Sequence, residues 1–425
     1  MMDFLKKRIG FIILLVAIFA FPSSLSTQAR LNMRAIVTGL AIDKVDDKYE
    51  ITAQIVKTSP STESGGEKAT VNFVSDTDKT IIGAISKLSY KTGKTAAFSH
   101  TNFLIIGKDV LEEDLTSTLD YFMRDNITND SMLLLMAEEK ASDEIKKTKD
   151  VELSIAIGLQ KVFMYREKEG DGVMTSLLNF MKESNTDSGT SVVSLLNLEK
   201  NDESQEDNPL GDKKSESSSS GGGSSSDSNS SGESGTEDGG EQGGGSKYQY
   251  FKAQTELCCF VQGRYVGKLE KQEVLGYMLA NKKATIDDVY VDEIESEVLK
   301  ARRIGVKIKD KTNTTKIRFE ENIPCLDLTV KIKNSSIYEI QSEELIDIPT
   351  DEEFEEIKKE LTKKISGDIA KCFEKSKNFG ADVWNAYSIA QKYHHKTTNE
   401  FYGSRDEFLK NLRLNVIVEI DRLEY

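Results

Sequence analysis

The chain has 425 residues, of which 38% are hydrophobic and 30% charged, and its formal net charge is -15. A chain of this length can bury more than one core, so we expect two or three domains. The negative charge argues against nucleic-acid binding, because phosphate recognition depends on clustered lysine and arginine. The four cysteines all lie in the second half of the chain and do not form the pattern of a disulfide framework.

The first 29 residues have the pattern of an export signal. Three basic residues at positions 6–8 precede an uncharged apolar run from 9 to 21, and small polar residues follow. A basic start, an apolar core and small residues after it are typical of a secretory signal peptide. The uncharged stretch is also about long enough to span a bilayer without cleavage. We therefore predict a signal peptide or membrane anchor at residues 1–29, with the rest of the chain outside the membrane.

Residues 201–246 consist almost wholly of Ser, Gly, Asp, Glu and Asn. Ordering such a segment would cost backbone entropy without burying apolar surface in return. We predict a disordered acidic linker here. It divides the chain into an N-terminal body at residues 31–200 and a C-terminal body at residues 247–425.

The N-terminal body alternates predicted strands and helices. Apolar residues at every second position on either side of Asp46-Asp47 predict a hairpin. Apolar residues at helical spacing predict helices near 81–88 and 111–122, and continuous apolar runs predict buried strands at 103–106 and 132–137. These elements predict a mixed α/β layer structure in which helices cover a sheet.

The C-terminal body has a different pattern. Apolar and polar residues alternate between 306 and 332, which predicts an antiparallel sheet with one wet face, and again at 412–420, which predicts a final strand. Thr350 followed by Glu353 forms a capping-box pattern, and the apolar stripe from Phe354 to Phe373 predicts a long helix on the sheet. The predicted fold class is therefore α+β and multi-domain, with a mixed α/β N-terminal body and a C-terminal antiparallel sheet packed by a long amphipathic helix.

No motif in the chain points to catalysis, a cofactor or a metal. The pair His394-His395 lacks ligands at metal-binding spacing, and His100 has no nucleophile motif beside it. Cys258-Cys259 lies in an apolar strand, where burial is the usual state and a vicinal disulfide or a redox role is the alternative. We predict no catalytic, cofactor-binding or metal-binding residues, and we do not expect an enzyme.

Three short segments carry the most recognisable pattern of the chain. The first is Gly39 to Lys44, just before the predicted hairpin, and the second runs from His100 to the Arg124-Asp125 turn. The third and most specific is Phe260-x-x-Gly263-x-x-x-Gly267-Lys268-Leu269-x-x-x-Glu273-x-x-Gly276. In this order the segments resemble the Ger(x)C family of spore germination proteins, over nearly the whole chain except the linker.

The resemblance implies a non-catalytic C subunit of a GerA-type nutrient germinant receptor. Such a subunit would lie on the outer face of the inner spore membrane, with two polytopic partners, a large A subunit and a transporter-like B subunit. Members of the family are typically lipid-modified at a cysteine after the signal, but no cysteine precedes Cys258 here. We therefore expect attachment through the N-terminal apolar segment or through the partners.

The candidate partner contacts come from the same segments and from the single tryptophan: Phe260, Gly263, Gly267, Lys268, Glu273, Gly276, Arg124, Asp125 and Trp384. The alternative for the glycines, Lys268 and Glu273 is a hairpin turn and a capped, packed helix, and for the tryptophan it is half-buried packing. Two other classes of protein stay open. An extracytoplasmic solute-binding protein would need a preformed cleft, and an exported hydrolase would need catalytic motifs that the sequence does not present.

Overall fold

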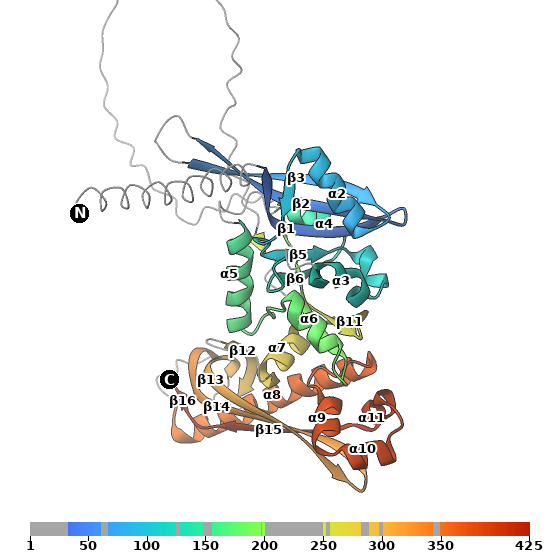
Figure 1. The fold of residues 1–425 in the computed structure, drawn as a ribbon. Coiled ribbons are helices and arrows are strands. Elements are labelled where there is room, and N and C mark those ends of the chain that lie inside the picture. Colours follow the sequence, from blue (N-terminus) through green and yellow to red (C-terminus); the bar gives the residue numbers. More distant parts are fainter. Residues whose placement is uncertain are drawn as a thin grey trace, which may run out of the picture.

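The computed structural model shows two bodies stacked end to end (Figure 1). It describes residues 33–60, 67–124, 128–147, 155–196, 198–199, 250–251, 256–281, 289–296, 301–342 and 349–425. The predicted signal or anchor at 1–29 and the predicted linker at 201–246 lie outside these residues. Within the described residues, no helix combines the length and the apolar character needed to cross a membrane.

The upper body is built on one large mixed sheet. Its described strands follow the order β11-β10-β7-β6-β5-β1-β2-β3, and β4 pairs with β1. The strands are β1 (Arg34–Val45), β2 (Lys48–Pro60), β3 (Glu67–Asp78), β4 (Thr95–Ala97), β5 (Phe103–Ile106), β6 (Leu133–Ala137), β7 (Thr190–Leu196), β10 (Leu257–Val261) and β11 (Arg264–Leu269). The centre, from β1 through β5 and β6 to β7, is parallel, and antiparallel hairpins extend it on both sides.

Helices cover both faces of this sheet, as its buried parallel centre requires. The core on one face includes α2 (Ile81–Thr92), α3 (Leu115–Arg124) and α6 (Leu177–Ser184), together with the short helix η1 (Lys108–Glu112). The core on the other face includes α4 (Ala141–Lys147) and α5 (Ile155–Lys168). The hairpin predicted at Asp46-Asp47 is confirmed, with φ angles of 48° and 58° at these residues, as a two-residue turn of the primed type needs.

The lower body pairs a second sheet with a long helix. The sheet follows the order β12-β13-β14-β15, and β16 pairs with β14; its strands are β12 (Val289–Ser296), β13 (Ala301–Glu320), β14 (Ile323–Ser342), β15 (Arg413–Ile420) and β16 (Leu423–Glu424). The first three strands are antiparallel, whereas β15 runs parallel to β14. A separate pair, β8 (Leu198–Glu199) with β9 (Tyr250–Phe251), completes the described strands.

The long helix α8 (Asp351–Asn378) buries its apolar stripe against this sheet. The described chain also has α7 (Lys271–Ala280), α9 (Ala386–Tyr393), α10 (His395–Phe401) and α11 (Arg405–Asn411). The predicted α+β class, with a mixed α/β N-terminal body and a C-terminal sheet packed by a long helix, is confirmed. The C-terminal sheet was predicted to be antiparallel, which holds for β12, β13 and β14 but is wrong for β15, because the chain returns through α8 to α11 and enters β15 parallel to β14.

One pairing joins the two halves of the chain. The strands β10 and β11 follow the 201–246 segment, yet β10 pairs along its length with β7, from Val261 opposite Thr190 to Leu257 opposite Ser194. The first sheet is therefore completed by residues from the segment that also forms the lower body. The two bodies are therefore joined by the β7–β10 pairing of the first sheet, and not only by a connecting segment of the chain.

The N-terminus of α8 offers a direct test of how the sequence defines this helix. The Thr350 hydroxyl accepts from the Glu353 N–H, and the Glu353 carboxylate accepts from the Thr350 N–H at 2.6 Å. We expect Thr350→Ala to lower the free energy of unfolding by about 0.5–2 kcal/mol, because the Glu353 N–H loses its hydroxyl acceptor and the Glu353 carboxylate loses the hydroxyl that orients it. Urea unfolding measures the change. Thr350→Ser keeps the hydroxyl, so a loss of equal size in that variant would contradict the capping role.

Candidate functional site

The Phe260–Gly276 segment lies at the junction of the two bodies. It forms β10, the turn at Gln262-Gly263 and β11, which are the end of the first sheet, and α7, which follows them and packs against α8 (Figure 1). Residues of η1, α3, α8, α9 and α11 contact this segment or the adjoining turn at 186–190. We call the segment and these contacting residues together the junction. The predicted contact residues of this segment are thus gathered in one region.

The turn between β10 and β11 is fitted against the start of α3. Gln262 and Gly263 have φ angles of 48° and 78°, and the Gly263 carbonyl accepts from the Leu115 N–H at 2.9 Å. A Cβ on Gly263 would lie 2.6 Å from Thr116 Cγ2 and 3.0 Å from the Thr116 nitrogen. Glycine is therefore required here both by the backbone conformation and by the space.

The other two glycines of the segment are contacted by α8 and its C-terminal cap. A Cβ on Gly267 would lie 2.7 Å from the Phe379 ring, and one on Gly276 would lie 2.5 Å from the carbonyl carbon of Asp368. The second contact is with backbone, which cannot rotate away. The helices α7 and α8 can cross at this distance only because position 276 has no side chain.

Phe260 is fully buried in the core of the upper body, on the face of β10 that packs against α6. Its ring meets Phe180 edge-on at 5.3 Å and Tyr265 at 5.9 Å between centroids. The packing inside the chain accounts for Phe260, Gly263, Gly267 and Gly276. Their predicted role as partner contacts stays a prediction.

Lys268 and Glu273 make contacts of a different kind. The Lys268 ammonium lies 2.8 Å from a carboxylate oxygen of Glu256, and this hydrogen bond raises the pKa of Lys268. Glu273 accepts from the N–H of Glu270 at 2.9 Å, which completes a capping box at the start of α7. Its carboxylate also lies 3.3 Å from Lys375 of α8, so it ties the two helices together.

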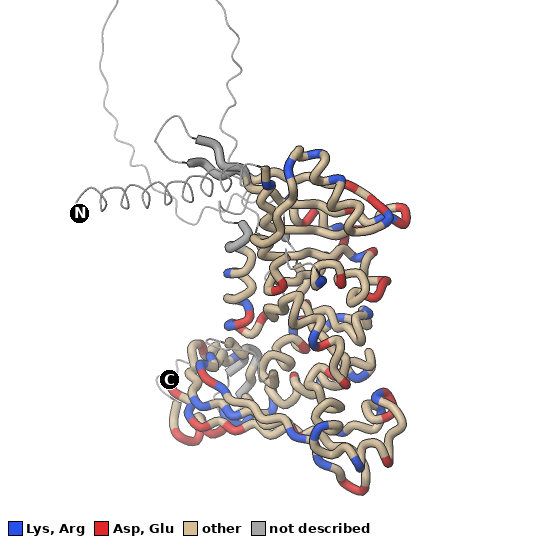
Figure 2. Tube along the Cα trace, in the orientation of Figure 1, with Lys and Arg blue, Asp and Glu red and all other residues tan. Residues whose placement is uncertain are grey.

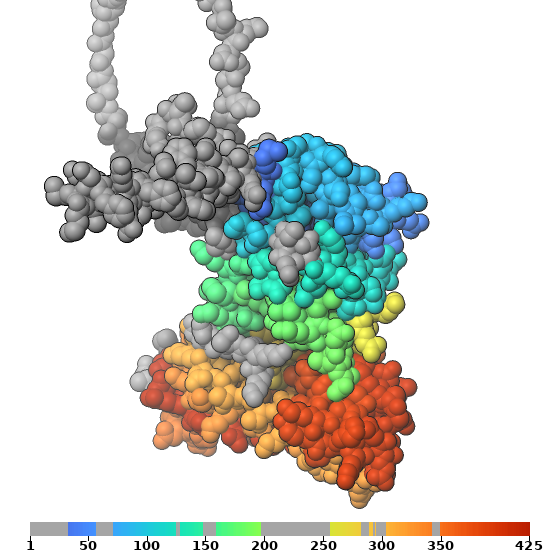
Figure 3. Space-filling model, viewed as in Figure 1, coloured from blue at the N-terminus to red at the C-terminus, as the bar shows by residue number. Residues whose placement is uncertain are grey.

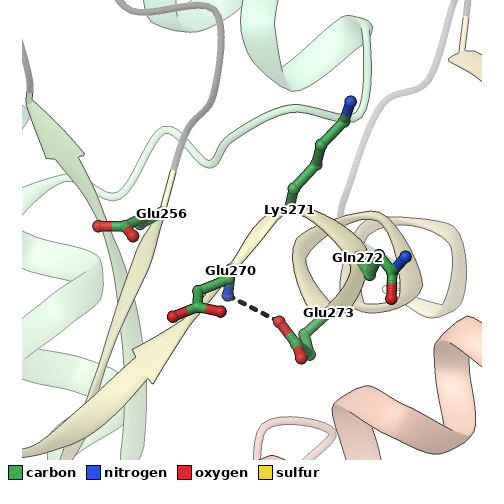
Figure 4. A pocket seen from close by; sticks show the side chains of 5 residues that line it. All are labelled: Glu256, Glu270, Lys271, Gln272 and Glu273. Atoms are coloured by element: carbon green, nitrogen blue, oxygen red, sulfur yellow. Dashed lines mark hydrogen bonds between the residues drawn. The ribbon is translucent and has the colours of Figure 1, made fainter.

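An acidic hollow of about 270 Å³ opens beside this cap. Figure 4 shows its lining, Glu256, Glu270, Lys271, Gln272 and Glu273, with Lys271 extending away from the carboxylates of Glu270 and Glu273. Among the residues that the structure describes, no group of three or more His, Cys, Asp or Glu is placed to hold a metal ion. The hollow is a polar surface feature at the start of α7.

The remaining predicted contacts lie apart from one another. Trp384 is only 7% exposed and stacks on Phe373 with 6.3 Å between centroids, which is a packing role within the lower body. Arg124, at the end of α3, has an 80% exposed side chain and pairs with Asp120 one turn earlier. Asp125 lies outside the described residues.

The other predicted motif, Gly39 to Lys44, also has a structural explanation. Asp43 is buried, and its two carboxylate oxygens accept from the N–H groups of Ala141 and Ser142 at 2.7 Å each, at the start of α4. Burial raises the pKa of the Asp43 carboxyl, although these hydrogen bonds act in the opposite direction. A Cβ on Gly39 would lie 2.5 Å from the Phe103 ring of β5. The motif therefore caps the start of α4 through Asp43 and allows the close approach of β1 to Phe103 at Gly39.

A buried polar cluster at the junction was missed by the sequence analysis. The carboxylate of Asp382 accepts from the Ser188 hydroxyl at 2.7 Å and from the N–H groups of Ala386 and Tyr387 at 2.8 Å. The Asp382 N–H donates to the Thr190 hydroxyl. Ser188 and Thr190 belong to the upper body, whereas Asp382 precedes α9, so the cluster links segments almost 200 positions apart in the chain.

Arg405 closes the same cluster from α11. Its Nε donates to the Ser188 carbonyl at 2.6 Å, and its Nη2 donates to the Gly380 carbonyl at 2.5 Å and to the Thr190 hydroxyl at 3.1 Å. Ser188 and Ser388 add a reciprocal pair of N–H to hydroxyl bonds. Figure 3 shows the corresponding contact as the green end of the upper body reaching the red C-terminal helices.

The pKa of Asp382 is raised because the carboxyl is buried, while its hydrogen bonds and the nearby Arg405 charge act in the opposite direction. The four free cysteines are also buried, and burial raises the pKa of Cys259 to about 12. A thiol with so high a pKa is a poor nucleophile at neutral pH. Both thiols of Cys258-Cys259 are free and buried, as the packing role requires.

A second hollow, of about 340 Å³, lies on the seam of the junction. Its lining combines basic side chains with apolar ones from the β10–β11 hairpin, from the C-terminal end of α8 and from α11. The lining residues are Val261, Val266, Lys377, Asn378, Phe379, Gly380, Arg405, Asp406, Leu409 and Lys410. Of the cations, Arg405 is engaged in the buried cluster and Lys377 donates to the Leu412 carbonyl at 2.9 Å. On the face shown in Figure 2, basic and acidic residues are interspersed.

The fold and the junction define a class: an α+β protein of two bodies, interlocked by glycine contacts and a buried polar cluster. Residues 27–198 match the family model of the spore germination protein N-terminal domain, and residues 255–423 match that described as spore germination B3/GerAC like, C-terminal. The chain belongs to the Ger(x)C family of spore germination proteins, as the resemblance in the sequence indicated.

A solved structure supports the fold independently. The crystal structure of the GerBC protein is similar to this chain with a TM-score of 0.50 and 14% sequence identity, over 91% of this chain and 96% of that chain. A comparison with curated proteins finds no match.

The crossing of α7 and α8 can be tested with a matched pair of glycines. We expect Gly276→Ala to lower the free energy of unfolding by about 1–3 kcal/mol, because the new methyl group would overlap the Asp368 backbone. Gly367 lies on α8 itself with nothing near its Cβ position, so Gly367→Ala should raise stability by about 0.4–1 kcal/mol. Urea unfolding of both variants measures these changes. If Gly276→Ala and Gly367→Ala changed the free energy of unfolding equally, the α7–α8 crossing would have room for the added methyl group.

The buried cluster predicts a pH dependence. A carboxyl whose pKa is raised on folding stabilises the protein fully below its ordinary value of 3.8, and this contribution is lost as the pH rises through the raised pKa. Asp382→Asn removes the titration. We therefore expect the stability of the unmodified chain, relative to this variant, to fall with pH from about 4 upward. Urea unfolding at a series of pH values measures it, and a constant difference would contradict the raised pKa.

Proposed function

We propose that this chain is the C-type subunit of a nutrient germinant receptor in the spore and that it acts without catalysis of its own. The observation that carries the proposal is how the structure uses the Phe260–Gly276 segment, the family's most specific motif. Its glycines are used to bring hairpin, helix and cap into contact, and Glu273 ties α7 to α8. The motif is therefore explained by the packing of the chain itself, without any catalytic role for its residues.

The proposed setting is the outer face of the inner spore membrane, beside two polytopic partners. The support is the membership in the Ger(x)C family and the apolar sequence of residues 1–29, which has the pattern of a signal or anchor. In such a complex the chain would stabilise the assembly, or bias its conformational states through contacts that differ between them. Neither role requires this subunit to contact the germinant.

A solute-binding protein is the second candidate, and one observation favours it. The 340 Å³ hollow on the seam has an apolar lining with basic residues around it, and its volume is at the lower end of about 300–1,000 Å³ for small-molecule sites. A thermal shift with a small amphipathic anion, lost in Leu409→Asp, would favour this candidate.

Co-purification tests the receptor proposal. A tagged copy is captured from detergent-solubilised membranes of sporulating cells, and we expect two polytopic proteins in stable proportion. Arg124 is the most exposed described residue of the predicted contacts, so Arg124→Glu should lower their yield several-fold. Lys363→Glu is the matched control, because its side chain is 77% exposed and also pairs one turn away, with Glu360. Capture of the chain alone, from the soluble fraction, would reject the proposal.

A further inference from the structure

The outer edge of β15 differs from the other sheet edges. β15 is the last strand in the order β12-β13-β14-β15, and among the described residues no strand pairs with its outer side. Backbone N–H and C=O groups on such an edge are a template for another strand, and proteins usually blunt it with Lys, Pro or bulges. The sequence of β15, RLNVIVEI, contains neither Lys nor Pro, and its register with β14 is regular.

The edges at β3 and β12 are blunted. At β3, two lysines of α2 donate to backbone carbonyls, Lys87 to Thr77 at 2.8 Å and Lys91 to Ser75 at 2.6 Å. At β12, the sequence VYVDEIES carries three acidic residues, and its pairing with β13 has two register shifts. The edge at β15 has neither of these protections.

Burial along β15 shows that its apolar face is incomplete. Leu414, Val416, Val418 and Ile420 face the α8 core but stay only partly buried, while the residues opposite them on β14 are fully buried: Leu326, Leu328, Val330 and Ile332. On the other face, Ile417 is 43% exposed. One more strand with the same alternation would cover both sets of side chains.

We propose that β15 pairs antiparallel with β15 of a second copy of this chain, with Ile417 on the two-fold axis. In this register Ile417 meets Ile417, Val416 meets Val418 and Leu414 meets Ile420. Toward the ends, Asn415 lies opposite Glu419 and Arg413 opposite Asp421. Every apolar residue thus meets an apolar one, and the basic residue meets an acidic one, as a self-complementary two-fold contact requires.

Neighbouring registers are less complementary. If Val416 lay on the axis, Ile417 would lie opposite Asn415. A register shifted by a single residue would place the core-facing side chains of one copy on the exposed face of the other. The second sheets of the two copies would become one continuous sheet. A strand pair alone is small beside the roughly 1,200–2,000 Å² of a stable complex, so we expect a dimer that dissociates on dilution.

Site-specific cross-linking tests the register on the full chain in mild detergent. Directly opposite residues have Cβ atoms about 4.5–5.5 Å apart, so Ile417→Cys should form a disulfide-linked dimer under a mild oxidant. The four native thiols are buried, which keeps the background low. Asn415→Cys is the matched control, because its two copies would lie roughly 13 Å apart along the strands. A mixture of Asn415→Cys with Glu419→Cys chains should link again.

Ile417→Lys gives a second readout, because it places two like charges on the axis of an otherwise exposed site. At a concentration where the unmodified chain is dimeric, sedimentation should show a monomer for Ile417→Lys, while Ile417→Val stays dimeric. At concentrations where all three chains are monomeric, the melting temperature of Ile417→Lys should be unchanged. Equal linking at all positions, an unmodified chain that is monomeric at every concentration, or a dimer that survives Ile417→Lys would each overturn the proposal, as would linking of Ile417→Cys to a different protein. Yield of polytopic partners is expected to be the same in Ile417→Lys, so this test fails or succeeds separately from the receptor proposal.

Discussion

The structure depends on the backbone-to-backbone approach of α7 and α8 at Gly276. Side chains can adjust to a small displacement, but a helix backbone in contact with another cannot, since any added methyl group meets the Asp368 carbonyl. Because α7 continues directly from β11, the same contact sets the position of the first sheet against α8. The fits of Gly263 against α3 and of Gly267 against Phe379 then fix the orientation about that point.

The polar cluster around Asp382 adds a second kind of contact to the close approach of α7 and α8. Burying a carboxyl group is costly, and the cost is offset only if its hydrogen bonds are satisfied in one geometry. Ser188, two N–H groups at the start of α9 and the charge of Arg405 meet that condition. Glycine contacts permit a close approach, whereas the cluster selects one arrangement of the bodies among several that would bury similar apolar area.

The sequence predicted local structure well and long-range pairing poorly. The Asp46-Asp47 hairpin and the capping box of Thr350 and Glu353 depend on neighbours in the chain, so their patterns are readable. The Phe260–Gly276 motif could be recognised, but its meaning lay in contacts with Thr116, Asp368 and Phe379, which no local pattern specifies. The bond from Ser188 to Asp382 spans 194 positions, and a lone Ser and Asp carry no signal for it. The pairing of β10 with β7 was unpredictable for the same reason.

The interlocked junction has a consequence for how a partner could act on this chain. Phe379 covers one face of β11 at Gly267, and α7 is held by α8, so a partner that bound over these contacts would have to displace the molecule's own packing. Binding at surfaces that remain free costs no such rearrangement. Relative movement of the two bodies would have to break the hydrogen bonds of the Asp382 cluster, which join the turn at 186–190 to α9 and α11. A change of state that keeps these bonds would therefore be located in the contacts of the chain with other proteins.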